Sequence, residues 1–132
     1  MDSVSVSLSV RVVTDARREA TEIFKLGLKA SKAGIHRTLN RAPKGKGWVQ
    51  CVNAPAGLMC RPEKVRESIE LFVRAYQTFP DIVALNQIAL GHEMLGEREA
   101  ARAHFTRMRE QAIAENLAAY VQAAEAGLAR LG

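Results

Sequence analysis

Hydrophobic and polar residues alternate strictly at the start of the chain. Apolar residues occupy every even position from Val4 to Val12, and serines and one arginine occupy the odd positions. A period of two with β-branched residues is typical of a strand, so the pattern predicts a strand over residues 3–12. A single strand cannot pair its own backbone N–H and C=O groups. It needs the short segment of residues 48–52, or a second copy of the chain in a homodimer, or it is a tail that orders only on a partner.

A helical period replaces this alternation after residue 14. Apolar residues recur at steps of three and four, and Thr14 or Asp15 can cap the N-terminus, so we expect a helix over residues 15–33. The apolar stripe consists of Ala20, Ile23, Phe24, Gly27 and Leu28. Proline and glycine interrupt residues 40–62 too often for a helix, which predicts a long loop.

The second half of the chain carries four helical patterns separated by short breaks. Pro62 suits a first helical turn, and Pro80 and Gly96 interrupt the pattern further on. The predicted helices cover residues 62–79, 82–95, 97–112 and 115–131. Because the connections are short, consecutive helices must run antiparallel. We therefore expect a mostly α fold of antiparallel helical hairpins over residues 62–132, preceded in residues 1–61 by a strand, a basic helix and a Pro/Gly-rich loop.

Small and large residues recur at fixed spacings within these helices. One complete pattern is carried by Leu85, Ile88-Ala89, Leu95-Gly96, Ala101 and Phe105, and the second half of an earlier one by Ser68, Phe72, Ala75 and Pro80. Over residues 63–131 this resembles the tetratricopeptide-repeat family, whose unit is a helix pair of about 34 residues. The resemblance implies hairpins of the tetratricopeptide type. It also implies that a further helix covers the first half-motif, supplied by residues 15–33 or by another chain.

The resemblance further implies a groove lined by the first helix of each pair. In the complete motif that face carries Val83, Asn86, Leu90 and Glu93. Asn86 would hold a partner's backbone, and Val83 and Leu90 would take its apolar side chains. The predicted function is a non-catalytic protein–protein interaction adaptor or scaffold with a protein or peptide partner. The alternative is that this face contacts only the N-terminal segment or the last helix.

Charge is distributed unevenly along the chain. Residues 1–66 hold 13 basic and 5 acidic side chains, whereas residues 67–132 hold 6 and 9, which together give a net charge of +5. Cations neutralise phosphates, and an exposed tryptophan can stack on a base. The expected anion-binding residues are Lys25, Lys29, Lys32, Arg37, Arg41, Lys44, Lys46 and Trp48. The second predicted function is therefore a nucleic-acid-binding or ribonucleoprotein component, or a binder of another polyanion. The alternatives are a solvated basic surface and a buried Trp48.

The remaining candidate chemistry is weak. His92 and His104 lie on neighbouring predicted helices and are the best pair for a metal, but packing roles account for them as well. No nucleophile or nucleotide-binding motif is present, so we expect no enzyme activity, no metal and no cofactor. No apolar run reaches the ~20 residues of a membrane helix, so we expect no membrane partner.

Two cysteines, Cys51 and Cys60, are too few for a secreted disulfide framework. The first residues lack the basic start and continuous apolar stretch of a signal peptide. We therefore expect a cytoplasmic protein with two free thiols, with a disulfide between them as the alternative.

Overall fold

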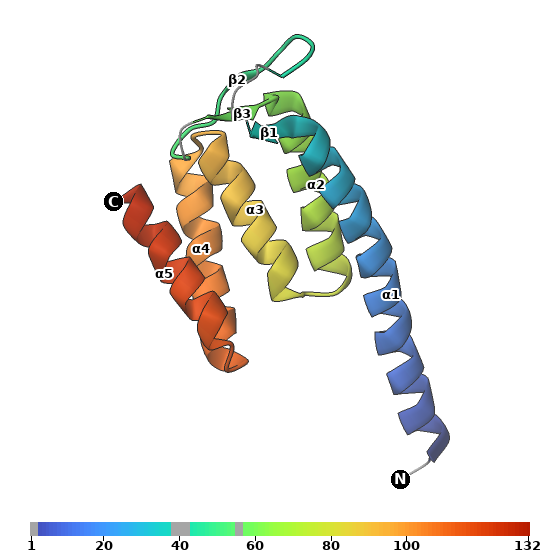
Figure 1. The fold of residues 1–132 in the computed structure, drawn as a ribbon. Coiled ribbons are helices and arrows are strands. Elements are labelled where there is room, and N and C mark those ends of the chain that lie inside the picture. Colours follow the sequence, from blue (N-terminus) through green and yellow to red (C-terminus); the bar gives the residue numbers. More distant parts are fainter. Residues whose placement is uncertain (1–2, 38–42, 55–56) are drawn as a thin grey trace.

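The computed structural model describes residues 3–37, 43–54 and 57–132 (Figure 1). This part of the chain is mostly helical, as predicted. Its elements in chain order are α1 (Ser3–Gly34), β1 (Ile35–Arg37), β2 (Val49–Gln50), β3 (Leu58–Cys60), α2 (Pro62–Thr78), α3 (Ile82–Met94), α4 (Arg98–Ala114) and α5 (Ala118–Leu131). Helices α2 to α5 begin and end within 3 residues of the predicted bounds. Within the described ranges, no helix has both the length and the apolar character needed to cross a membrane.

The strand predicted over residues 3–12 is wrong. Helix α1 begins at Ser3 and continues to Gly34, so this segment is the N-terminal part of a 32-residue helix. Among the described strands, β1, β2 and β3 pair only with one another. A lone strand would leave its backbone groups unpaired, whereas a helix pairs them within the segment. This requirement outweighs the alternation of side chains.

Helix α1 packs along α2, so the helix that covers α2 is supplied by the same chain and not by another one. The rings of Phe24 and Phe72 lie 5.1 Å apart between their centroids. The two helices approach closely at Gly27, where a Cβ atom would lie 2.6 Å from the Phe72 ring. Such a distance excludes any larger residue unless the ring moves. The N-terminal part of α1 extends beyond the end of α2 (Figure 1).

Helices α3, α4 and α5 follow as a second antiparallel group with its own core. The Asp81 side chain accepts a hydrogen bond from the backbone N–H of Val83 at 2.9 Å and thereby caps α3. Gly96 has a φ of +78° and permits the tight turn into α4. Leu85 and Phe105 are fully buried in the core of these three helices.

The three strands form a small antiparallel sheet at one end of the bundle, with β3 between β1 and β2 (Figure 1). Within it, Val49 pairs with Cys60. The backbone N–H of Val52 donates to the carbonyl of Met94 at 2.8 Å, which ties the segment after β2 to the end of α3. The long loop of the sequence prediction thus contains two strands that are attached to the helices.

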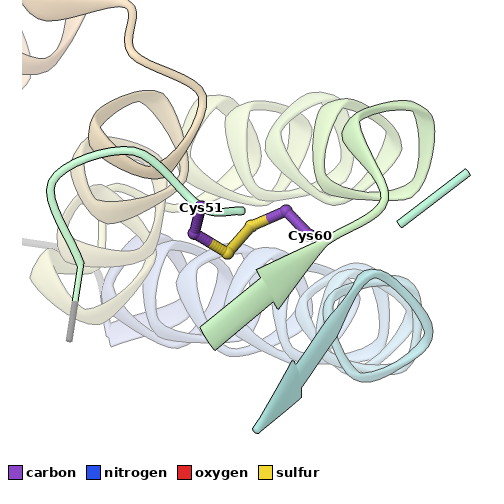
Figure 2. Close-up of a disulfide and its surroundings, with 2 residues drawn as sticks. All are labelled: Cys51 and Cys60. Atoms are coloured by element: carbon purple, nitrogen blue, oxygen red, sulfur yellow. A yellow bond between two sulfur atoms is a disulfide. The ribbon is translucent and has the colours of Figure 1, made fainter. Parts of the chain in front are cut away.

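Cys51 and Cys60 form a disulfide, so the prediction of two free thiols is wrong (Figure 2). The backbone N–H of Cys51 donates to the carbonyl of Leu58 at 3.0 Å, which makes Cys51 a diagonal neighbour of Cys60 across β2 and β3. Their Cα atoms are 5.2 Å apart. Both are buried and pack with Val65 and Phe72 in the core beneath the sheet.

Candidate functional site

The four expected partner-binding residues lie at steps of three and four along α3, and their exposure differs. Val83 is 36% exposed, Asn86 and Leu90 are half-buried, and Glu93 is only 4% exposed. Hollows lie at the two ends of this row. Val83 lines those at the start of α3, and Leu90 and Glu93 line one at its end.

Two neighbouring hollows share Val83 in their linings, and together they are called the Val83 groove below. One, of about 170 Å³, lies between α1, α2 and α3. The other, of about 750 Å³, extends from there to the start of α5. Both are lined by Arg17, Phe79, Asp81 and Val83. The guanidinium of Arg17 lies 4.8 Å from the centroid of the Phe79 ring.

The wider part of the Val83 groove adds two tyrosines to this lining, Tyr76 and Tyr120. The Tyr76 hydroxyl donates to the side-chain carbonyl of Gln111 at 2.6 Å, so its ring is held in place. Partly exposed aromatic rings and a cation in a hollow are typical of protein-binding surfaces. Of these residues, Val83 alone was predicted from the sequence as a partner contact, because Arg17 and the aromatic rings come from α1, α2 and α5.

The hollow at the other end of α3 measures about 570 Å³ and is lined by an ion pair between the buried carboxylate of Glu93 and the exposed side chain of Arg130. Both carboxylate oxygens of Glu93 accept hydrogen bonds from the Arg130 guanidinium, at 2.8 and 2.9 Å. The Asn53 side-chain amide donates to the same carboxylate at 2.8 Å. This pairing raises the pKa of Arg130. Glu93 therefore joins α3, α5 and the segment after β2, and its carboxylate is already engaged within the chain.

The expected anion-binding residues fall into two separate groups. Lys25, Lys29 and Lys32 are exposed on α1, where Lys25 pairs with Glu22 at 3.2 Å. The second group lies at the sheet end of the bundle and comprises Arg37, Lys44, Lys46 and Trp48. Arg41 lies outside the described residues.

Trp48 is partly exposed and is held by a residue that the sequence analysis left out, Arg61. Continuing the pairing of Val49 with Cys60 by one position places Trp48 opposite Arg61. The Arg61 guanidinium lies 4.5 Å from the ring centroid of Trp48, and the His36 ring lies 5.8 Å from it. Trp48 is thus neither a core residue nor a free surface ring.

His92 and His104 stack with ring centroids 5.2 Å apart. Burial lowers the pKa of His92, against the hydrogen bond with Glu97, which raises it. Burial by itself raises the pKa of Glu97, but hydrogen bonds with Arg66 and His92 lower it overall. Across the described ranges, no group of three or more His, Cys, Asp or Glu side chains is placed to hold a metal ion.

Comparisons with protein-family models, with curated proteins and with solved structures give no match for this chain.

Proposed function

We propose that this protein is a non-catalytic binding module that holds a segment of a protein partner in the Val83 groove. The observation that carries the proposal is the lining of this groove by side chains of all five helices, with Phe79, Tyr76 and Tyr120 around Val83. The spacing of residues 63–131, which resembles tetratricopeptide repeats, supports the same function.

The groove is lined by carboxylates of Asp81, which caps α3, and Glu115, whereas its α1 side carries cations. On that side the cations favour a partner that carries both apolar and acidic side chains. Arg17 lines the groove from α1. Lys25 is exposed and follows the groove residue Thr21 by four positions, so it continues the same side of α1. An apolar side chain of the partner would contact Val83 and Phe79, and an acidic one would face Arg17 and Lys25.

The disulfide bears on where this binding takes place. Disulfides persist in oxidising compartments and are rare in the cytosol. The buried Cys51–Cys60 bond therefore supports an oxidising location over the cytoplasmic one that the sequence suggested.

A peptide selection tests the proposal. Peptides selected from a random display library on the immobilised protein are measured for affinity to the wild type and to Val83→Gln. Binding can bury only the third of Val83 that is still exposed, which contributes about 0.5–1 kcal/mol. An unpaired Gln amide in the interface costs about 1–3 kcal/mol more, so we expect Val83→Gln to weaken binding at least about tenfold. Ile113→Gln is the matched control, because Ile113 is 51% exposed on α4 and does not line the groove.

The selected peptides should be rich in Asp, Glu and apolar residues, and Ile113→Gln should bind them as the wild type does. If Val83→Gln also binds them with unchanged affinity, or if the selection yields no binder, the groove is not the binding site.

A further inference from the structure

The connection between β1 and β2 contains a basic loop. Its described part, residues 43–48, is held by hydrogen bonds from one arginine, Arg61. Arg61 donates from Nε to the carbonyl of Lys46 and from Nη2 to the carbonyl of Lys44, both at 3.1 Å. Trp48 donates from Nε1 to the same carbonyl of Lys44, also at 3.1 Å. The loop backbone therefore has a defined shape, and its two lysine side chains are exposed.

Glycines make this arrangement feasible. Gly45 has a φ of +98°, and a Cβ atom there would collide with Nη2 of Arg61. Gly47 has a φ of +86° with open space around it. Positive φ values at both positions let the backbone turn its carbonyls toward Arg61.

All charged side chains in the sequence around this loop are basic. From residue 23 to residue 62 the sequence contains eight Lys and Arg side chains and no Asp or Glu. In the described part of the chain, none of the cations Arg37, Lys44, Lys46 and Arg61 forms an ion pair. Exposed cations without acidic partners attract a polyanion.

The aromatic group beside these cations narrows the class of polyanion. Trp48 and Arg61 form a cation–π stack, and both side chains remain partly exposed. Nucleobases stack on aromatic rings and on guanidinium planes. A bilayer anchor would need to project its ring, whereas the Trp48 ring is attached to the loop through Nε1 and flanked by Arg61 and His36. These contacts favour a nucleic acid over a lipid surface.

We infer that the loop of residues 43–48, together with Arg37 and Arg61, binds single-stranded nucleic acid. Lys44 and Lys46 pair with phosphates beside the stack of Trp48 and Arg61, on which one base packs. Arg37 lies on the opposite edge strand, level with Leu58, and pairs with a phosphate further along the nucleic acid. The surface lies at the sheet end of the bundle, whereas Val83 lies at the start of α3 next to the turn from α2, so this binding is separate from that in the Val83 groove.

The intrinsic fluorescence of Trp48 gives a direct test, because this is the only tryptophan of the chain. An unlabelled thymidine oligonucleotide of about 12 nucleotides is titrated into the full-length, disulfide-bonded protein. We expect quenching as a base packs on the ring. With three phosphates neutralised, the slope of log affinity against log salt is about −2, so binding weakens roughly fifteen- to twentyfold between 50 and 200 mM salt.

Two variants of equal charge change separate this loop from the basic helix. Lys44→Gln/Lys46→Gln should reduce the salt slope to about −0.7, because one phosphate contact remains, and should weaken binding at 50 mM salt at least about tenfold. Lys25→Gln/Lys29→Gln on α1 should bind within twofold of the wild type. Circular dichroism checks that both variants keep their helical content. Equal losses in the two variants would show unspecific attraction by net charge and would overturn the assignment.

Further titrations distinguish nucleic acid from other polyanions. Polyphosphate has phosphates without bases, heparin is an anionic glycan, and vesicles of phosphatidylglycerol present a lipid surface. A Trp48 response to any of them as strong as that to the oligonucleotide would reject the nucleic-acid assignment, as would oligonucleotide binding that leaves Trp48 fluorescence unchanged.

Discussion

The contact between Phe105 of α4 and Gly127 of α5 allows a test in which the effect of one substitution changes sign. Phe105 is 1% exposed. A Cβ atom on Gly127 would lie 2.6 Å from its ring, so the two helices are as close as the glycine permits. The test compares Phe105→Ala, Gly127→Ala and the double variant.

Each single substitution should destabilise the protein for a different reason. Truncating a buried phenylalanine costs about 3–5 kcal/mol, because it leaves a cavity. Alanine in place of glycine within a helix contributes about 0.5–1 kcal/mol of stability, whereas overpacking costs about 1–3 kcal/mol. In the wild-type background the clash with the Phe105 ring should outweigh the helical gain, so Gly127→Ala should lower the free energy of unfolding by up to about 2.5 kcal/mol.

The ring is absent in the Phe105→Ala background, so only the helical gain of Gly127→Ala remains. The double variant should therefore be about 0.5–1 kcal/mol more stable than Phe105→Ala alone. Urea unfolding followed by circular dichroism measures all the free energies.

The half-buried Phe79 provides a matched control, since it lies at the end of α2 and has no contact with Gly127. Phe79→Ala and Gly127→Ala should add without coupling. If Gly127→Ala destabilises the Phe105→Ala protein as much as the wild type, the close packing of α4 on α5 is not as described.

The disulfide and His92 provide two further tests. Thiol titration of the denatured protein should find no free thiol before reduction and two after it. The free energy of unfolding of Cys51→Ala/Cys60→Ala should be about 2–3 kcal/mol lower than that of the wild type, because the loop that the disulfide closes is short. Since burial lowers the pKa of His92 below its usual 6.5, the unfolded state binds the proton more readily. The free energy of unfolding should therefore fall as the pH drops from 6.5 toward the folded-state pKa, and less so in His92→Gln. If the free energy of unfolding fell equally with pH in the wild type and in His92→Gln, the contribution of His92 would be contradicted.

Local sequence signals determined the second half of the fold. The Pro80-Asp81 break, the capping carboxylate of Asp81 and the turn glycine Gly96 act within a few residues of where they stand. The helical period of residues 62–131 marks one buried face for each helix. Such features depend on the backbone of the segment itself, so the helix bounds could be predicted to within 3 residues.

The candidate site depended on contacts between distant parts of the chain. Glu93 pairs with Arg130 across 37 positions, and the Val83 groove combines residues from five helices. A repeat pattern could place Val83 and Glu93 on one face of α3. It could not show that the carboxylate of Glu93 is already bound within the chain.

The dependence on contacts between distant residues also explains the two wrong predictions, which are the strand over residues 3–12 and the free thiols of Cys51 and Cys60. The alternation of residues 3–12 fits a strand only if a partner strand is available, and the described chain offers none, so its backbone bonds are made within α1. Cys51 and Cys60 meet because β3 aligns antiparallel to β2, and the same register sets Trp48 against Arg61. The sequence by itself determined which segments pair their backbone groups locally. Only the tertiary structure decided which side chains meet, because a contact between distant residues depends on how every intervening element packs.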